Sequence, residues 1–206
     1  MRVFGRGTWP AGLVAVTVAA GLTACTGGGK SVDEGAKACS KGTYTWAGIR
    51  HTEKLTALAD PISFAKKTEH YSAHLKPVGD TVYRPKVTGV PAGATATGVI
   101  KVLGAHLKVE EPLADPSEVE RPSEDEYFET TEDLEGAYYS WAYISLVDAD
   151  FTYTCGSEQP VKGHVLTWET TGSGFLPCDS DPTDVATGRT AARETCPDGS
   201  KATKGA

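Results

Sequence analysis

The sequence predicts an α+β domain built mainly from antiparallel β-sheet, with one or two short helices and two disulfides. Three observations support this fold class: aromatic and β-branched segments bounded by turn residues, one stretch with helical spacing, and an even number of cysteines after Cys25. An all-β sandwich is the alternative, and it would be correct if residues 97–109 formed a strand.

Several segments carry the strand pattern. The first, Gly42–Ile49, is rich in Thr and aromatic residues and has glycines near both ends. Tyr71–Leu75 and Thr81–Val87 flank the turn-forming residues 77–80, so we expect these two segments to form a hairpin. The most apolar and aromatic segments should be the central strands, and they are Tyr138–Val147, Phe151–Cys155 and His164–Thr171.

Helical spacing is clearest over Thr97–Val109, with Thr95 or Thr97 as the N-cap. The predicted apolar face consists of Val99, Val102, Leu103, His106 and Leu107. On that face the imidazole of His106 should be partly buried and hydrogen-bonded. A second helix is predicted to begin near Pro182–Asp184 and to run to Cys196.

The four later cysteines, Cys39, Cys155, Cys178 and Cys196, allow three pairings. A turn at residues 157–160 would not place Cys155 opposite Cys178, which disfavours that pair. Two pairings remain, and of these we predict Cys39–Cys155 and Cys178–Cys196, the second of which closes a loop of about 18 residues. A zinc site is disfavoured, because no two cysteines have the short spacing that is typical of structural zinc ligands.

An acidic run spans residues 110–135, where twelve carboxylates stand against one basic side chain, Arg121. Three prolines interrupt the run, so we expect an extended surface excursion rather than a packed element. The functional interpretation is a surface that binds a divalent cation or a cationic partner, but the run lacks the spaced ligands and the central glycine of an EF-hand loop.

The N-terminus has the order of parts found in an export signal: Arg2 and Arg6, the apolar stretch Leu13–Ala20, and then Leu22–Cys25. This apolar stretch is shorter than the roughly 20 residues that a membrane-spanning helix needs. The first 25 residues resemble a bacterial lipoprotein precursor, with Leu22–Cys25 as its lipobox. The resemblance implies cleavage before Cys25 and attachment of a diacylglyceryl group, with fatty acyl chains such as palmitate, to the Cys25 thiol.

The expected domain organisation is a signal peptide at 1–24, the lipidated cysteine and a flexible tether at 25–38, and a single extracytoplasmic domain at 39–206. Removing Arg2 and Arg6 leaves 18 basic against 27 acidic side chains, a charge of −9 that disfavours nucleic acid as a partner. The mature part is loosely similar to secreted lipoproteins of high-GC Gram-positive bacteria. The lipoprotein resemblance implies a location on the outer face of the cytoplasmic membrane, and the loose similarity of the mature part implies no activity.

We assign no catalytic residue, metal ligand or cofactor from the sequence. Asp148 and Asp150 would share one face of a strand, but aspartates between two strands more often accept hydrogen bonds in a turn. His70 and His74 are four residues apart but lack the glutamate of an HExxH motif. We therefore expect a non-enzymatic binding or structural module of the cell envelope, which contacts membrane lipid through Cys25 and a wall polymer or an envelope protein through its domain. The alternative is a secreted hydrolase or a metal-binding protein that uses these side chains.

Overall fold

The computed structural model describes residues 42–121, 127–130 and 133–204. Contacts divide the chain into two units, 1–35 and 36–206, and all the described residues belong to the second. The elements in chain order are β1 (Thr43–Ala59), β2 (Ile62–Thr68), β3 (Tyr71–Pro77), β4 (Lys86–Thr88), α1 (Ala96–Leu107), β5 (Tyr127–Thr130), β6 (Leu134–Thr154), β7 (Val161–Pro177), α2 (Ala186–Thr195) and the 3-10 helix η1 (Lys201–Thr203).

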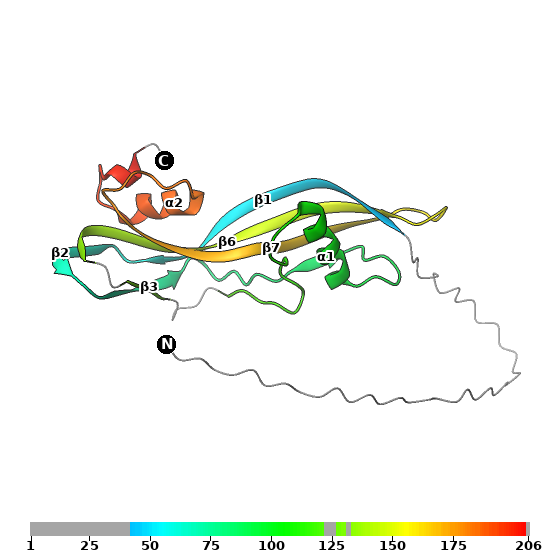
Figure 1. Ribbon diagram of the computed structural model, residues 1–206, viewed down its shortest axis with the longest axis horizontal. Coiled ribbons are helices and arrows are strands. Elements are labelled where there is room, and N and C mark those ends of the chain that lie inside the picture. Colours follow the sequence, from blue (N-terminus) through cyan, green and yellow to red (C-terminus); the bar gives the residue numbers. More distant parts are fainter. Residues whose placement is uncertain (1–41, 122–126, 131–132, 205–206) are drawn as a thin grey trace, which may run out of the picture. The chain divides into compact units, whose positions relative to one another are not determined.

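The fold is α+β, as predicted, with a seven-stranded antiparallel sheet and two α-helices among the described residues (Figure 1). The all-β alternative is wrong, because Ala96–Leu107 is helical. The strands lie in the order β4-β7-β6-β1-β3-β5, and β2 pairs with β6 outside this path. The long central strand β6 pairs with β7 from Tyr138 to Tyr153 and with β1 from Trp141 to Thr154.

β1 and β2 lie one after the other along β6, because Leu58 pairs with Trp141 and Ile62 pairs with Tyr138. Pro61 separates the two strands; it has no backbone N–H to donate, which explains the break. The resulting three-strand layer of β1–β2, β6 and β7 is the frame on which the rest of the domain packs.

Side-chain alternation gives this layer two faces. On one face of β6, Val147, Ala149 and Phe151 pack against α1, and Tyr139 and Trp141 pack against α2. On the opposite face, Ala142 of β6 is buried in a cluster with Ala73 and Leu75 of β3. Ile144 of β6 is buried in a second cluster with Ala114 and Trp168. The domain therefore has several cores distributed along the sheet.

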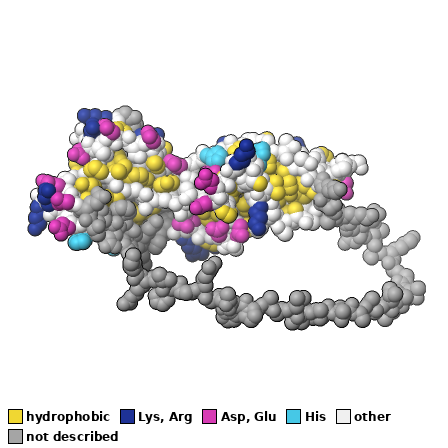
Figure 2. All heavy atoms as spheres, in the orientation of Figure 1, with side chains coloured by type: hydrophobic (Ala, Val, Ile, Leu, Met, Phe, Trp, Pro, Cys, Tyr) yellow, Lys and Arg dark blue, Asp and Glu magenta, His cyan; other side chains and the backbone are white. Residues whose placement is uncertain are grey.

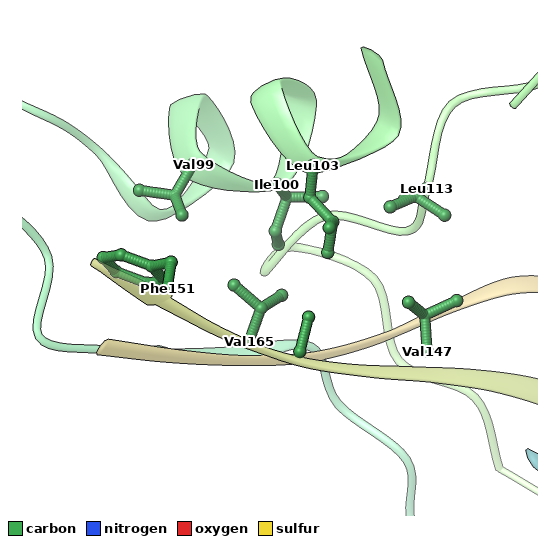
Figure 3. Close-up of a cluster of buried hydrophobic side chains, with 8 residues drawn as sticks. Val99, Ile100, Leu103, Leu113, Val147, Phe151 and Val165 are labelled. Atoms are coloured by element: carbon green, nitrogen blue, oxygen red, sulfur yellow. The ribbon is translucent and has the colours of Figure 1, made fainter. Parts of the chain in front are cut away.

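α1 begins at the predicted cap: the Thr95 hydroxyl accepts a hydrogen bond of 3.0 Å from the backbone N–H of Gly98. Val99, Ile100 and Leu103 point from α1 toward Val147, Phe151 and Val165 (Figure 3). The predicted face was partly wrong, because Ile100 is buried whereas Val102 and His106 are exposed. His106 lies beside the Trp46 ring, with ring centroids 6.3 Å apart, at the edge of the cluster rather than within it.

α2 begins at Ala186, a few residues after the predicted start, and Cys196 follows its last residue, Thr195. The predicted Cys178–Cys196 disulfide is present and joins the end of α2 to the chain beyond β7. Cys155 is also disulfide-bonded. Its predicted partner, Cys39, lies outside the described residues, so that pairing stays a prediction.

Two strand predictions were wrong. Tyr71–Leu75 and Thr81–Val87 do not form a hairpin, because β3 pairs with β1 and β5, and β4 pairs with β7. The predicted segments 138–147 and 151–155 are not separate strands: residues 138–154 belong to one uninterrupted strand, because pairing with β1 and β7 carries β6 through Asp148, Ala149 and Asp150. Two paired neighbours outweigh the turn preference of the aspartates.

The acidic run is more closely packed than we expected. Leu113, Ala114 and Leu134 are buried. Glu120 forms an isolated antiparallel bridge with Tyr83. β5, which also belongs to the acidic run, pairs with β3. Residues 122–126 and 131–132 lie outside the described part of the chain. The acidic run therefore contributes both to the sheet and to the surface beside α1.

Candidate functional site

The first candidate site is formed by charged side chains on three neighbouring strands. Arg50 lies on β1, Asp148 and Asp150 lie on β6, and His164 lies on β7. The register explains their proximity, because Asp148 pairs with Arg50 and Asp150 pairs with His164. Gly48 has a φ of +58°, in the left-handed region, and lies in the β-bulge of β1 that shifts Arg50 into this register.

The contacts in this group are short. Nη2 of Arg50 lies 2.7 Å from Oδ1 of Asp148. Nδ1 of His164 lies 2.9 Å from Oδ1 of Asp150, and its Nε2 lies 3.6 Å from Oδ2 of Asp148. The structure thus places Asp148 and Asp150 on one face of β6, not in the turn that we favoured, and adds two partners that the sequence did not reveal. The missing information was the register of β6 with β1 and with β7, which has no local sequence signal.

This group is open to solvent, since the Arg50 and Asp150 side chains are 69% and 65% exposed. Within the described residues, neither ring nitrogen of His164 is hydrogen-bonded to a hydroxyl or a thiol. Exposed ion pairs of this kind contribute about 0–1 kcal/mol each. The arrangement can link β1, β6 and β7 through charge, but it does not pair a nucleophile with a base.

The two histidines considered as a metal pair lie elsewhere. His70 lies between β2 and β3, whereas His74 lies on β3, and both are exposed. Among residues 42–121, 127–130 and 133–204, no three His, Cys, Asp or Glu side chains are placed to hold a metal ion. The structure therefore does not bring these histidines together with Asp148 and Asp150.

The second candidate is a cleft of about 420 Å³ between α1 and the segment that follows it, called here the α1 cleft. Its apolar lining includes Ile100, Gly104, Ala105 and Leu113. Gly104 allows Val109 to approach α1 closely, since a Cβ there would lie only 3.3 Å from the Val109 side chain. Ile100 and Leu113 are almost fully buried, so the cleft rests directly on the α1 core.

The polar lining of the α1 cleft is mainly acidic, and it consists of Glu110, Glu111, Asp115, Glu118, Lys101 and Thr97. Figure 2 shows acidic side chains grouped beside α1 on the face it draws. Hydrogen bonds from the Ser117 hydroxyl and backbone N–H, together with the Lys101 charge, hold the pKa of Asp115 below its ordinary value. The Asp115 backbone N–H in turn donates to Oε1 of Glu118 at 2.8 Å, which fixes the turn that carries both carboxylates.

The sequence predicted the negative charge of this region but not the cleft. The cleft depends on the fold of residues 109–118 back against α1, including the 3.0 Å bond from the Ala114 backbone N–H to the Trp168 carbonyl. No protein-family model matches the chain, and no curated protein or solved structure is significantly similar to it. In the described part of the chain, no helix is long and apolar enough to cross a bilayer.

Proposed function

We propose that this protein is a lipid-anchored binding module of the cell envelope. The observation that carries the proposal is the order of residues at the N-terminus: Arg2 and Arg6, a short apolar stretch, and Leu22–Cys25. In this proposal the chain is cut before Cys25, and acyl chains on the Cys25 sulfur hold the domain on the outer face of the cytoplasmic membrane. Two or more acyl chains are needed for stable anchoring, because a single chain binds a membrane only marginally.

Two features of the domain support this proposal. The Cys178–Cys196 disulfide suits an oxidising compartment outside the cytoplasm. The α1 cleft offers an apolar floor with charged groups at its edge, which is the usual composition of a ligand site. The exposed ion-pair group around His164 favours a structural role, so we place the binding role at the cleft.

Substitution of one thiol tests the anchor. In a Gram-positive host that processes lipoproteins, Cys25→Ser removes the acyl acceptor, so the protein should move from the membrane pellet to the medium or wall fraction. Incorporation of a clickable palmitate analogue should be lost at the same time. Thr26→Ser changes the adjacent residue and should leave both results as in the wild type. Membrane retention of Cys25→Ser with undiminished labelling would refute the anchor.

A further inference from the structure

The α1 cleft combines an apolar floor with an acidic edge, and this combination specifies the chemistry of an occupant. We propose that the cleft binds a short peptide segment in which an apolar side chain stands between basic side chains. This inference deepens the proposed binding role and rests on it, because it names the class of ligand that the anchored domain would hold.

The size of the cleft limits the occupant to a few residues. Small-ligand pockets have volumes of about 300–1,000 Å³, and the α1 cleft, at about 420 Å³, lies near the lower end. Such a volume admits one or two apolar side chains, not the surface of a folded domain. Above the buried Ile100 and Leu113, the side chains of Ala105, Val109 and Pro112 reach the surface of the cleft, where they would remove an apolar side chain from water, which is the main source of affinity.

The charge of the edge selects the residues that flank the apolar side chain. Four carboxylates line the cleft against the single ammonium of Lys101, and this ammonium lies close enough to Asp115 to lower its pKa. Asp115 and Glu118 are also bound within their own turn. Glu110 and Glu111 are exposed, and within the described residues neither forms an ion pair, so they are the groups that an incoming cation would meet.

This pattern favours a basic peptide over other occupants. Anionic polymers would be repelled by the edge. A single organic amine would satisfy one carboxylate and leave the adjacent one without a counter-charge. A metal ion would make no use of the apolar floor, and the described residues include no three metal-ligating side chains placed around an ion. A lysine-leucine-lysine sequence offers two charges and one apolar group in a single short segment.

The binding test uses protein purified from the expressing cells and an acetylated, amidated lysine-leucine-lysine peptide, with affinity measured by calorimetry. We expect saturable binding to one site that weakens as the salt concentration rises, because salt screens exposed charges. The matched peptides lysine-glycine-lysine and glutamate-leucine-glutamate, and free hexylamine, should each bind at least tenfold more weakly. Equal binding of hexylamine would overturn the proposal of a peptide ligand.

Two variants locate the site. Glu110→Gln with Glu111→Gln should weaken peptide binding about threefold to tenfold, since each exposed ion pair contributes modestly. Ala105→Phe places a ring in the cleft and should weaken binding at least tenfold. The control is Glu158→Gln with Glu194→Gln, which makes the same charge change at two exposed positions that do not line the cleft and should leave affinity unchanged.

The outcomes separate this inference from the proposed anchor. Thermal unfolding of each variant verifies the fold, and because the two cleft variants alter different properties, one of them remains informative if the other unfolds. No binding of the peptide to wild type, or binding that survives both cleft variants, would overturn the cleft proposal. Neither result would alter the Cys25→Ser fractionation, which tests the anchor alone.

Discussion

α1 and α2 pack against the same long strands at different places, and different interactions hold them there. α1 buries the aliphatic side chains of Val99, Ile100 and Leu103 against β6 and β7. The buried residues of α2 are small or polar, and they are Thr187, Gly188, Ala191, Ala192 and Thr195. Burial of a Val, Leu or Ile side chain contributes about 1.5–3 kcal/mol, so α1 gains far more from apolar contact than α2.

α2 compensates with close approach and a covalent bond. Gly188 lies so close to Trp141 that a Cβ would stand 2.6 Å from Cζ2 of the indole, which lets the helix lie directly on the ring. The Cys178–Cys196 disulfide then joins the end of the helix to the chain that leaves β7. The comparison indicates that an apolar face stabilises α1, whereas α2 depends on its disulfide.

The largest expected effect comes from removing the central contact of α1. Leu103 is fully buried, so Leu103→Ala should lower the free energy of unfolding by about 2–5 kcal/mol through lost burial and a residual cavity. Urea denaturation measures this change. Val102→Ala, at a side chain that is 40% exposed on the same helix, should cost less than about 0.5 kcal/mol. Equal costs for the two variants would contradict the observed orientation of α1.

The second prediction removes the disulfide with Cys178→Ser and Cys196→Ser together. The bond joins residues 18 apart, and the chain-entropy model assigns a loop of this size about 3 kcal/mol. Hydrogen exchange should show lost protection in α2 while α1 stays protected, because α1 and the disulfide belong to separate clusters. A uniform loss of protection over both helices would show that the two regions are not independent.

The features of these two regions that could be predicted from sequence are those with local signals. The Thr95 cap and the helical spacing identified α1, and the even cysteine count with a suitable loop identified Cys178–Cys196. The buried face of α1 was only partly predicted, because Val102 and Ile100 lie on either side of the same stripe. Only packing on the sheet decides which of the two is buried.

Most of the structural features that the sequence did not predict depend on pairing between segments that are distant in the chain. The second half of β1 contains Arg50–Lys54, a polar segment without a strand signal, which becomes a strand because it pairs with β6. The separate register of β6 with β7 places His164 beside Asp150. The acidic charge near α1 could be predicted from composition, but the cleft requires residues 109–118 to fold against the helix. Such contacts between distant residues leave no periodic pattern in either segment.

The smallest expected effect concerns buried hydroxyl groups, which differ in hydrogen bonding between the region near α1 and the region beneath α2. Near α1, the buried Thr167 hydroxyl donates to the Ala114 carbonyl at 2.6 Å. Beneath α2, the hydroxyl of Tyr139 is buried without a hydrogen-bond partner among the described residues, and burial raises the pKa of this phenol, which keeps it neutral. One buried hydroxyl is therefore satisfied and the other is not.

Matched deletions of these hydroxyls should give unequal results. Thr167→Val leaves the Ala114 carbonyl unpaired in the interior and should cost about 1–3 kcal/mol in urea denaturation. Tyr139→Phe removes only a group that has already lost its bonds to water, so the free energy of unfolding should stay within about 0.5 kcal/mol of wild type or rise. A loss above about 1 kcal/mol for Tyr139→Phe would mean that a buried water satisfies the phenol, and α2 would then rest on a hydrated layer rather than on direct packing.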